Sequence, residues 1–280
     1  MRSSFAHTFV HVFTSVMSAF ENTLVSTLGG MLLLQYEVKM LATFVYTFRG
    51  LANVRGVHKA GANSAFIFIA ALMQSAGGGI VIPLLMNKTP APFVNDMLVM
   101  TLIINMAVQH FAPSVVEIAT DSTLINALLS TTFEIYRANG VCGAVKLGNS
   151  SLPASLDIGF PLFGPIFMGS IAGCAGGFLP LSKGLDPLKA GCKPNMKSGF
   201  AAAIFFHFWL NVWGGDAAAG QILVALFFIV LHVGLFLVER LGSKGKGSER
   251  SEKKATKAPA KAAPAVVKLV AVKTEDKKTN

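Results

Sequence analysis

Charged residues are scarce in this chain of 280 residues. Asp, Glu, Lys and Arg together make up 14% of the sequence, whereas soluble globular domains carry about 25%. Apolar residues make up 52%. This composition argues against an ordinary soluble domain and favours a protein whose main solvent is lipid.

Acidic residues are especially few, and the excess positive charge is concentrated at one end. The formal net charge is +10, from 24 Lys and Arg against 14 Asp and Glu. Residues 239–280 hold 12 of the basic and 5 of the acidic residues, so +7 of this charge belongs to the C-terminal tail. This distribution describes a basic tail rather than a nucleic-acid-binding surface, and no nucleic-acid partner is expected.

The sequence also lacks the motifs of metal sites and of common enzymes. Cys142, Cys174 and Cys192 are scattered and form no CxxC pair, which indicates neither a disulfide framework nor a zinc site. His7 and His11 have a one-turn spacing, but nothing completes a metal set, so no metal is expected. HExxH, GxSxG and Walker motifs are absent, and the protein is predicted not to be an enzyme. Three further histidines are expected to bond within a helix bundle: His110, His207 and His232.

Long apolar segments are what the sequence has instead. A helix that crosses a bilayer needs roughly 20 mainly apolar residues. Candidate spans are 24–48, 66–86, 97–113, 114–138, 158–181, 198–213 and 217–238. The predicted fold class is therefore an all-α integral membrane protein with about seven transmembrane helices.

The spans divide the chain into three parts. Residues 1–22 place phenylalanines at helical spacing opposite polar residues, which suits an amphipathic helix in the membrane interface; a signal peptide is the rival interpretation. Residues 23–240 form the predicted transmembrane domain. The tail, 241–280, mixes Lys, Ala, Pro, Ser and Gly, and is expected to be disordered, basic and cytosolic.

Basic residues between the spans predict the orientation. They follow the first and fifth spans and fill the tail, so all three segments lie on one side, which the positive-inside rule makes cytosolic. The N-terminus is then lumenal. The residues of the two loops are Arg49, Arg55 and Lys59, and Lys183, Lys189, Lys193 and Lys197.

The end of the tail indicates a cellular location. Lys277 and Lys278 stand fourth and third from the C-terminus, as in the dilysine retrieval signal of the endoplasmic reticulum. A chance pair in a lysine-rich tail is the alternative. The predicted location is the endoplasmic reticulum membrane, with multiple spans.

An internal repeat is the most informative feature. Residues 75–84 and 172–181 share a run of glycines followed by a proline, at a constant offset of 97 residues. The candidate residues are Gly77, Gly78, Gly79 and Pro83 in the first copy, and Gly173, Gly176, Gly177 and Pro180 in the second.

The position of each proline explains why these residues could matter. Pro83 and Pro180 each lack the N–H that would bond the carbonyl four residues earlier, at Gly79 and Gly176. The two helices are an odd number of spans apart and cross in opposite directions. We therefore predict inverted repeats of three spans, about 24–113 and about 114–213, with a seventh helix at about 217–238.

Paired helix breaks in inverted repeats point to an ion or substrate path near the midplane of the membrane. The alternative is that the glycines only allow the helices to pack closely. Two matched breaks favour the pathway.

Three segments resemble the trimeric intracellular cation (TRIC) channel family. Residues 70–79 (AALMQSAGGG) are similar to that family's second helix, which ends in a glycine triplet. Residues 133–137 (FEIYR) are similar to its Lys-Glu-Val motif with a downstream arginine, and 196–204 (MKSGFAAAI) to the entry of its sixth helix. The likeness covers roughly 66–238.

The resemblance implies a homotrimer in which each protomer holds a pore for monovalent cations, mainly K⁺. It implies a counter-ion current that balances Ca²⁺ movement across the reticulum membrane. It also implies a phosphoinositide held by the motif lysine, the arginine and the glycine breaks. Here the lysine position is Phe133 or Thr132, and only Glu134 and Arg137 carry over, so no cofactor is included in the prediction.

Other ionisable residues leave alternatives open. Glu134 and Arg137 are three apart and share a helix face, either as a structural ion pair or with Arg137 facing the pore. Glu37 and Lys39 face a cavity or lie near an interface, and Glu117 and Asp121 either concentrate cations at a pore mouth or belong to a solvated face.

Two other functions remain as alternatives. A secondary transporter could use the same broken-helix repeat. A scaffold could act through its basic tail, which would bind anionic lipid. The expected partners are membrane lipid, K⁺ and other monovalent cations, and further copies of the chain.

Overall fold

The computed structural model describes residues 2–34, 36–57, 62–174, 191–235 and 237–238. The predicted tail (241–280) lies outside these ranges. So do Gly176, Gly177 and Pro180, which means that the second predicted helix break is not described.

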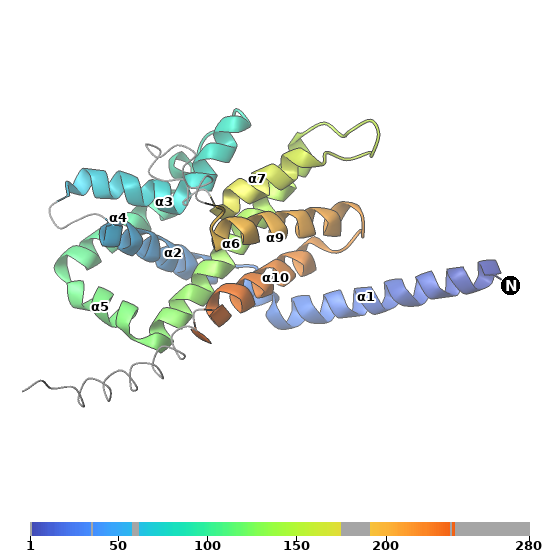
Figure 1. Cartoon of the computed structure of the whole chain (residues 1–280), viewed down its shortest axis with the longest axis horizontal. Coiled ribbons are helices and arrows are strands. Elements are labelled where there is room, and N and C mark those ends of the chain that lie inside the picture. The colour runs from blue at the N-terminus through green and yellow to red at the C-terminus, as the bar shows by residue number, and fades with distance from the viewer. Residues whose placement is uncertain (1, 35, 58–61, 175–190, 236, 239–280) are drawn as a thin grey trace, which may run out of the picture. The chain divides into compact units, whose positions relative to one another are not determined.

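All regular elements in the described ranges are helical, which confirms the all-α prediction (Figure 1). They are α1 (Arg2–Leu32), α2 (Tyr36–Val57), α3 (Ser64–Leu85), η1 (Ala91–Phe93), α4 (Asp96–Phe111), α5 (Pro113–Asp121), α6 (Thr123–Ser151), α7 (Phe163–Cys174), α9 (Pro194–Asn211), α10 (Ala217–Phe228) and the π-helical turn η4 (Ile229–Val233).

The first predicted span, 24–48, is divided between two helices. The predicted boundary at residue 22 falls inside α1, which continues to Leu32, and α2 begins at Tyr36. Leu34 adopts φ 52°, a left-handed conformation that ends a helix and is unusual for a residue with a branched side chain. Leu34 is also buried, so packing holds the turn that hydropathy alone did not predict.

The segment predicted as the fourth span, 114–138, also contains a break. Pro113 starts α5, and the axes of α4 and α5 differ by 97°. Ser122 then caps the N-terminus of α6, since its Oγ accepts the N–H of Ile125. Consequently α6 starts nine residues later than predicted and continues to Ser151.

Two sets of three helices are each packed together. In the first, α2, α3 and α4 all contact one another, and in the second, α6, α7 and α9 do. Helix α7 begins 99 residues after α3, and α9 begins 98 residues after α4, close to the sequence offset of 97. Between the sets, α2 contacts α6 and α3 contacts α7, so equivalent helices meet as a twofold arrangement requires.

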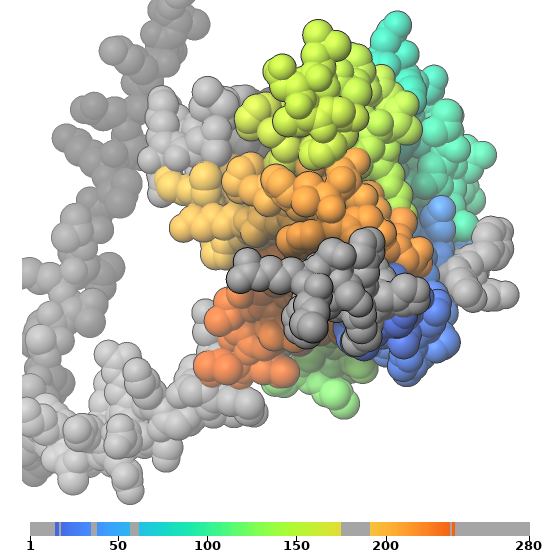
Figure 2. All heavy atoms as spheres, turned by 90° about the vertical axis from the view of Figure 1, so that its right-hand side faces the viewer, coloured from blue at the N-terminus to red at the C-terminus, as the bar shows by residue number. Residues whose placement is uncertain are grey.

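The remaining helices pack on the second set. Helix α10 contacts α6 and α9, and α1 contacts α10. Figure 2 shows α9, in yellow to orange, between α7 and α10. At the end of α1 the Asn139 amide donates to the carbonyl of Leu32 at 3.0 Å, which satisfies one of the carbonyls that a helix C-terminus leaves free.

Buried amide side chains attach α4 to α2. Asn105 donates to the carbonyl of Phe44 at 2.9 Å, and Gln109 donates to that of Phe48 at 3.1 Å. Because Asn105 and Gln109 are one turn apart, they fix the register of the two helices. Such hydrogen bonds hold helices together where both the surroundings and the core are apolar.

Large apolar side chains remain exposed on several helices. Ile69 of α3, Ile103 of α4, Phe167 of α7 and Phe200 of α9 are each about half exposed. Soluble monomers rarely leave so many uncovered, whereas lipid solvates them readily. By length and composition α3 qualifies as a membrane span, and the bent pair α4–α5 qualifies if counted as one; α7 and Ala217–Val233 are apolar but shorter. The total of seven spans stays a prediction.

Glycines set the distances between the helices of this core. A Cβ at position 78 would lie 2.7 Å from the Cα of Ala172, where α3 crosses α7. A Cβ at position 148 would lie 2.6 Å from the Cα of Pro165, where α6 meets α7. The packing alternative is therefore supported for Gly78, and the cavity described below shows that packing is not its only role.

Gly78→Ala should destabilise the protein, because the new methyl group meets backbone that cannot rotate away. We expect a loss of about 1–3 kcal/mol, as for other overpacked sites. Thermal unfolding in detergent measures it, with Gly56→Ala as the matched control, since a Cβ at position 56 meets nothing within 4 Å. Equal melting temperatures for both variants would contradict the close contact between α3 and α7 at Gly78.

Candidate functional site

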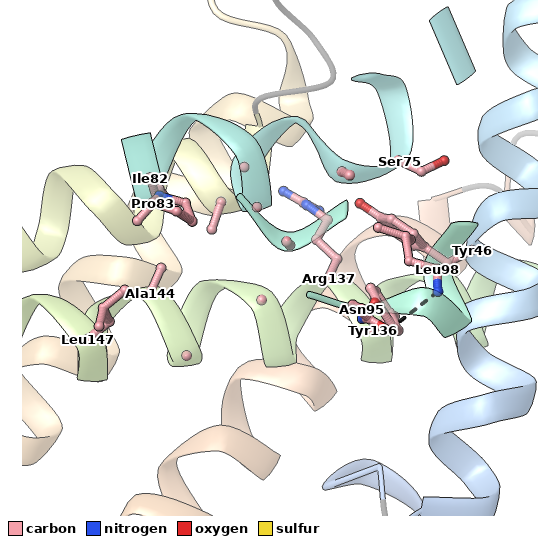
Figure 3. Close-up of a pocket in the computed structure, with 17 residues that line it drawn as sticks. Tyr46, Ser75, Ile82, Pro83, Asn95, Leu98, Tyr136, Arg137, Ala144 and Leu147 are labelled. Atoms are coloured by element: carbon pink, nitrogen blue, oxygen red, sulfur yellow. Dashed lines mark hydrogen bonds between the residues drawn. The ribbon is translucent and has the colours of Figure 1, made fainter. Parts of the chain in front are cut away.

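A cavity of about 260 Å³ lies where the two helix sets meet (Figure 3). Its walls come from α2, α3, η1, α4, α6 and α7. The lining includes three of the predicted first-copy residues, Gly78, Gly79 and Pro83, together with Arg137. Residues singled out by the repeat and by the charged motif are thus brought to one place.

Small residues form most of the cavity wall. On α6, Gly140, Gly143 and Ala144 follow Arg137 at helical spacing and face the cavity. A Cβ at position 140 or 143 would meet nothing within 4 Å, so these glycines leave open space. The volume is sufficient for several water molecules.

Pro83 places an unusual backbone group beside the cavity. It lies in the last turn of α3, and it cannot donate the hydrogen bond that the carbonyl of Gly79 would receive in a regular helix. Both residues line the cavity, and Figure 3 shows Pro83 near Ile82 at one end of it. Helix α3 is nevertheless continuous through the glycine run, so the first predicted break is a missing hydrogen bond rather than an interruption.

Arg137 joins three helices. Its Nε donates to the carbonyl of Gly173 at 2.7 Å, and its Nη2 donates to the carbonyl of Asn195 at 2.5 Å and to the Oγ of Ser198 at 2.9 Å. Its Nη1 donates to Glu134 at 2.8 Å. Every nitrogen of the guanidinium therefore has a partner, and these come from α6, the end of α7 and the first turn of α9.

The charge of Arg137 is neutralised locally. Arg137 and Glu134 are both buried, at 4% and 5% exposure, and form the ion pair predicted from their spacing. The guanidinium carbon also lies 4.2 Å from the centre of the Phe228 ring on α10, an attractive cation–π distance. Figure 3 shows the Arg137 side chain between α6 and α3. Arg137 therefore forms the ion pair and also lines the cavity, and that it faces a pore stays a prediction.

Gly173 contributes to this site by its backbone. A Cβ at position 173 would lie 3.0 Å from the Cα of Gly199, so the two glycines let α7 and α9 touch. That contact brings the Gly173 carbonyl within reach of Arg137. Gly77, by contrast, is buried in α3 and does not line the cavity.

The other ionisable candidates lie away from the cavity. Lys39 is exposed on α2, and Glu117 and Asp121 are exposed on α5. The side chain of Glu37 is not among those described. No group of three or more potential metal ligands occurs in the described part of the chain.

Comparison with known proteins gives a consistent result at the level of structure. No protein-family model and no curated protein matches this sequence. A structure reported as the basis for activity of TRIC counter-ion channels in calcium release superposes with a TM-score of 0.59 at 14% identity, covering 71% of this chain and 92% of that one.

Two structures of a trimeric intracellular cation channel from C. elegans also superpose. Without Ca²⁺ the TM-score is 0.57 at 17% identity, covering 74% of this chain and 93% of that one. With bound Ca²⁺ it is 0.59 at 14% identity, covering 74% and 94%. The chain has the fold of the TRIC channels. The structures that it resembles are described as channels.

Phe133, next to Glu134 on α6, is part of an aromatic stack. The Phe133 ring stacks on Tyr46, with centres 4.7 Å apart, and Tyr46 stacks in turn on Tyr136 at 4.4 Å. The guanidinium of Arg49 lies 5.8 Å from the Phe133 ring and donates to Ser130. An aromatic stack with an arginine from α2 therefore surrounds Phe133, one of the two positions that the sequence resemblance gives to the motif lysine, the other being Thr132.

The contribution of Arg49 was not anticipated from the sequence. The prediction that Arg49 and Arg55 lie in a loop is wrong, because both lie within α2, which continues to Val57. Arg49 is half-buried against α6, and Arg55 donates to the carbonyl of Gln109 at 3.0 Å. Arg49 is three residues from Tyr46 on the same helix, and this spacing is the sequence signal that could have placed Arg49 beside the site.

Glu134→Gln should destabilise the TRIC-like fold strongly, because it leaves the buried guanidinium without a counter-charge. A loss of roughly 3–5 kcal/mol is typical for breaking a buried pair. In Glu134→Gln/Arg137→Met the uncompensated charge is gone, and we expect part of the stability to return. Thermal unfolding of both variants in detergent tests this, and a double variant no more stable than the single would contradict it.

Proposed function

We propose that the protein is a channel for monovalent cations, mainly K⁺, that supplies counter-ion current across the endoplasmic or sarcoplasmic reticulum membrane during Ca²⁺ release or uptake. The observation that carries the proposal is the cavity in which Gly78, Gly79, Pro83 and Arg137 meet at the junction of the two helix sets. The TRIC fold supports it, since the compared structures are of cation channels.

The chemistry of the cavity suits a small hydrated cation. Ser75, Asn95 and the rings of Tyr46 and Tyr136 contribute polar groups to an otherwise small-residue wall. Carbonyl and hydroxyl oxygens replace part of a hydration shell without binding the ion so tightly that it cannot leave. Irregular backbone near Pro83 is tolerated in a membrane where it faces such a space.

Arg137 would set the electrostatic barrier on this path. A fixed positive charge repels cations, and Glu134 offsets it while the pair stays together. Conduction then depends on how the guanidinium is held, which makes Arg137 the control point of the path. The proposal includes no phosphoinositide, because neither Phe133 nor Thr132 supplies the lysine of the family motif.

The proposed assembly is a homotrimer. The compared C. elegans protein is described as trimeric, and the exposed apolar side chains offer surface to both lipid and further copies. Each protomer contains a complete cavity, so the pore would lie within the protomer rather than on the trimer axis.

Filling the cavity should reduce ion flux without disturbing the fold. Gly143→Val adds a side chain where nothing lies within 4 Å, and it projects into the cavity. We expect at least a several-fold fall in K⁺ current, measured by single-channel recording in planar bilayers under a K⁺ gradient. Recordings in which K⁺ is replaced by Na⁺, and then by a large organic cation, measure the ion selectivity of the same preparation.

Gly56→Val is the matched control, because position 56 is equally open but lies outside the cavity. Unchanged current in Gly143→Val would contradict a path through this cavity. Silence in bilayers together with solute-coupled uptake into liposomes would favour the alternative function, a secondary transporter using the same helix repeat.

The reticulum location is part of the proposal and depends on the tail. With the C-terminus cytosolic, Lys277 and Lys278 would be read as a retrieval signal. Replacing both by Ser should move the protein to later compartments, as seen by microscopy of the tagged chain. Replacing Lys253 and Lys254 by Ser is the control, because it removes the same charge from within the tail. Retention of the first variant in the reticulum would show that the lysine pair is coincidental.

A further inference from the structure

A π-helical turn continues α10. At η4 (Ile229–Val233) the N–H of Gly234 donates to the carbonyl of Ile229, five residues earlier. One extra residue in a turn rotates the following side chains by about 100° relative to a regular α-helix. Such turns often occur at functional sites, and this one contains His232, a residue that the proposed conduction path does not yet use.

The turn places His232 against the site of Arg137. Its Nε2 lies 2.9 Å from the Oγ of Ser198, and the same Oγ accepts a hydrogen bond from Nη2 of Arg137 at 2.9 Å. Ser198 therefore bridges the imidazole and the guanidinium. Phe228, on the same helix, contacts both: its ring centre lies 4.2 Å from the guanidinium and 6.2 Å from the His232 ring.

The direction of the hydrogen bonds between Arg137, Ser198 and His232 depends on the proton of the Ser198 hydroxyl. A hydroxyl donates one hydrogen bond and accepts up to two. The hydroxyl has two acceptors within reach, the Asn195 carbonyl at 3.2 Å and Nε2 of His232 at 2.9 Å. The shorter distance favours donation to Nε2, which requires a neutral His232 with its proton on Nδ1. The hydrogen bonds then run in one direction, from Arg137 to Ser198 and from Ser198 to His232.

We propose that His232 is a positioning residue for Arg137, acting through Ser198, and that its protonation makes cation flux sensitive to acid. The proposal rests on the proposed function, since it concerns the control of the same path. Histidine is the side chain whose charge ordinarily changes between about pH 5 and pH 8.

Protonation would change both the hydrogen bonds and the charge. A protonated Nε2 donates to Ser198, which then loses its acceptor and must turn its proton to Asn195, 3.2 Å away. Two cations then share one hydroxyl oxygen. Of the charged groups that face His232 in the described structure, Glu134 and Arg137, both on α6, are the nearest, so one carboxylate offsets two positive charges. The added positive potential beside the cavity opposes cation entry.

Cation flux into liposomes, with the same pH on both sides, tests the inference. The readout for each variant is the ratio of its flux at about pH 7.5 to that at about pH 5.5. We expect a several-fold fall on acidification for the unmodified protein, and a ratio near one for His232→Gln, whose amide cannot take up a proton. Ser198→Ala should also flatten the profile, because it removes the bridge.

His110→Gln is the control, because His110 is exposed at the end of α4 and contacts Phe111 rather than this cluster. An acid-dependent fall that persists in His232→Gln, or that is absent from the unmodified protein, overturns the inference. A merely structural role would lower the melting temperature of His232→Gln but leave the acid-dependent fall in place.

Two further measurements separate this inference from the proposed function. Nitrogen NMR of the protein in detergent, with the His232 signals assigned through His232→Gln, determines the tautomer of His232 independently of any flux measurement. A proton on Nε2 at neutral pH would overturn the proposed hydrogen bonding through Ser198. If the tautomer is as expected but Gly143→Val conducts normally, the proposed path fails while the arrangement of His232 stands.

Discussion

The buried guanidinium of Arg137 is the interaction on which this site depends. A charge in an apolar interior is tolerated only when it is paired and hydrogen-bonded. Arg137 meets that demand by drawing partners from three helices: a carboxylate of α6, a carbonyl at the end of α7, and a carbonyl and a hydroxyl of α9. The relative positions of α6, α7 and α9 are thereby coupled, and the cavity on the other side of the same residue takes its shape from them.

Close approach of backbones is the second constraint, and it serves the first. The Gly173 carbonyl reaches Arg137 because Gly173 and Gly199 let α7 and α9 touch, and α3 is held against α7 by the absence of a side chain at Gly78. Glycines in α6 have the opposite effect, since Gly140 and Gly143 leave space rather than fill it. One residue type thus produces both the tightest contacts and the opening, depending on whether a neighbouring backbone lies opposite.

The sequence predicted most of this arrangement where local rules decide. Hydropathy located α3, α4 and α9 to within a few residues, and the glycine–proline echo led to Gly78, Gly79 and Pro83 at the cavity. The three-residue spacing predicted the Glu134–Arg137 pair. The breaks at Leu34 and Ser122 were missed because a buried leucine in a left-handed turn and a serine cap carry little weight in an average over 20 residues. Arg49 and His232 could not be placed, since their partners lie on other helices, 81 and 34 residues away along the chain.

The carboxylate that neutralises Arg137 comes from the preceding turn of the same helix, and this affects how the protein can be made. Helix α6 is synthesised before α7 and α9, when none of their carbonyls or hydroxyls is present. A lone arginine at position 137 would oppose insertion into the bilayer at that stage, whereas Glu134 and Arg137 enter as a pair without net charge. Later helices then have to contribute only neutral groups, so assembly of the site requires no further charge to be buried.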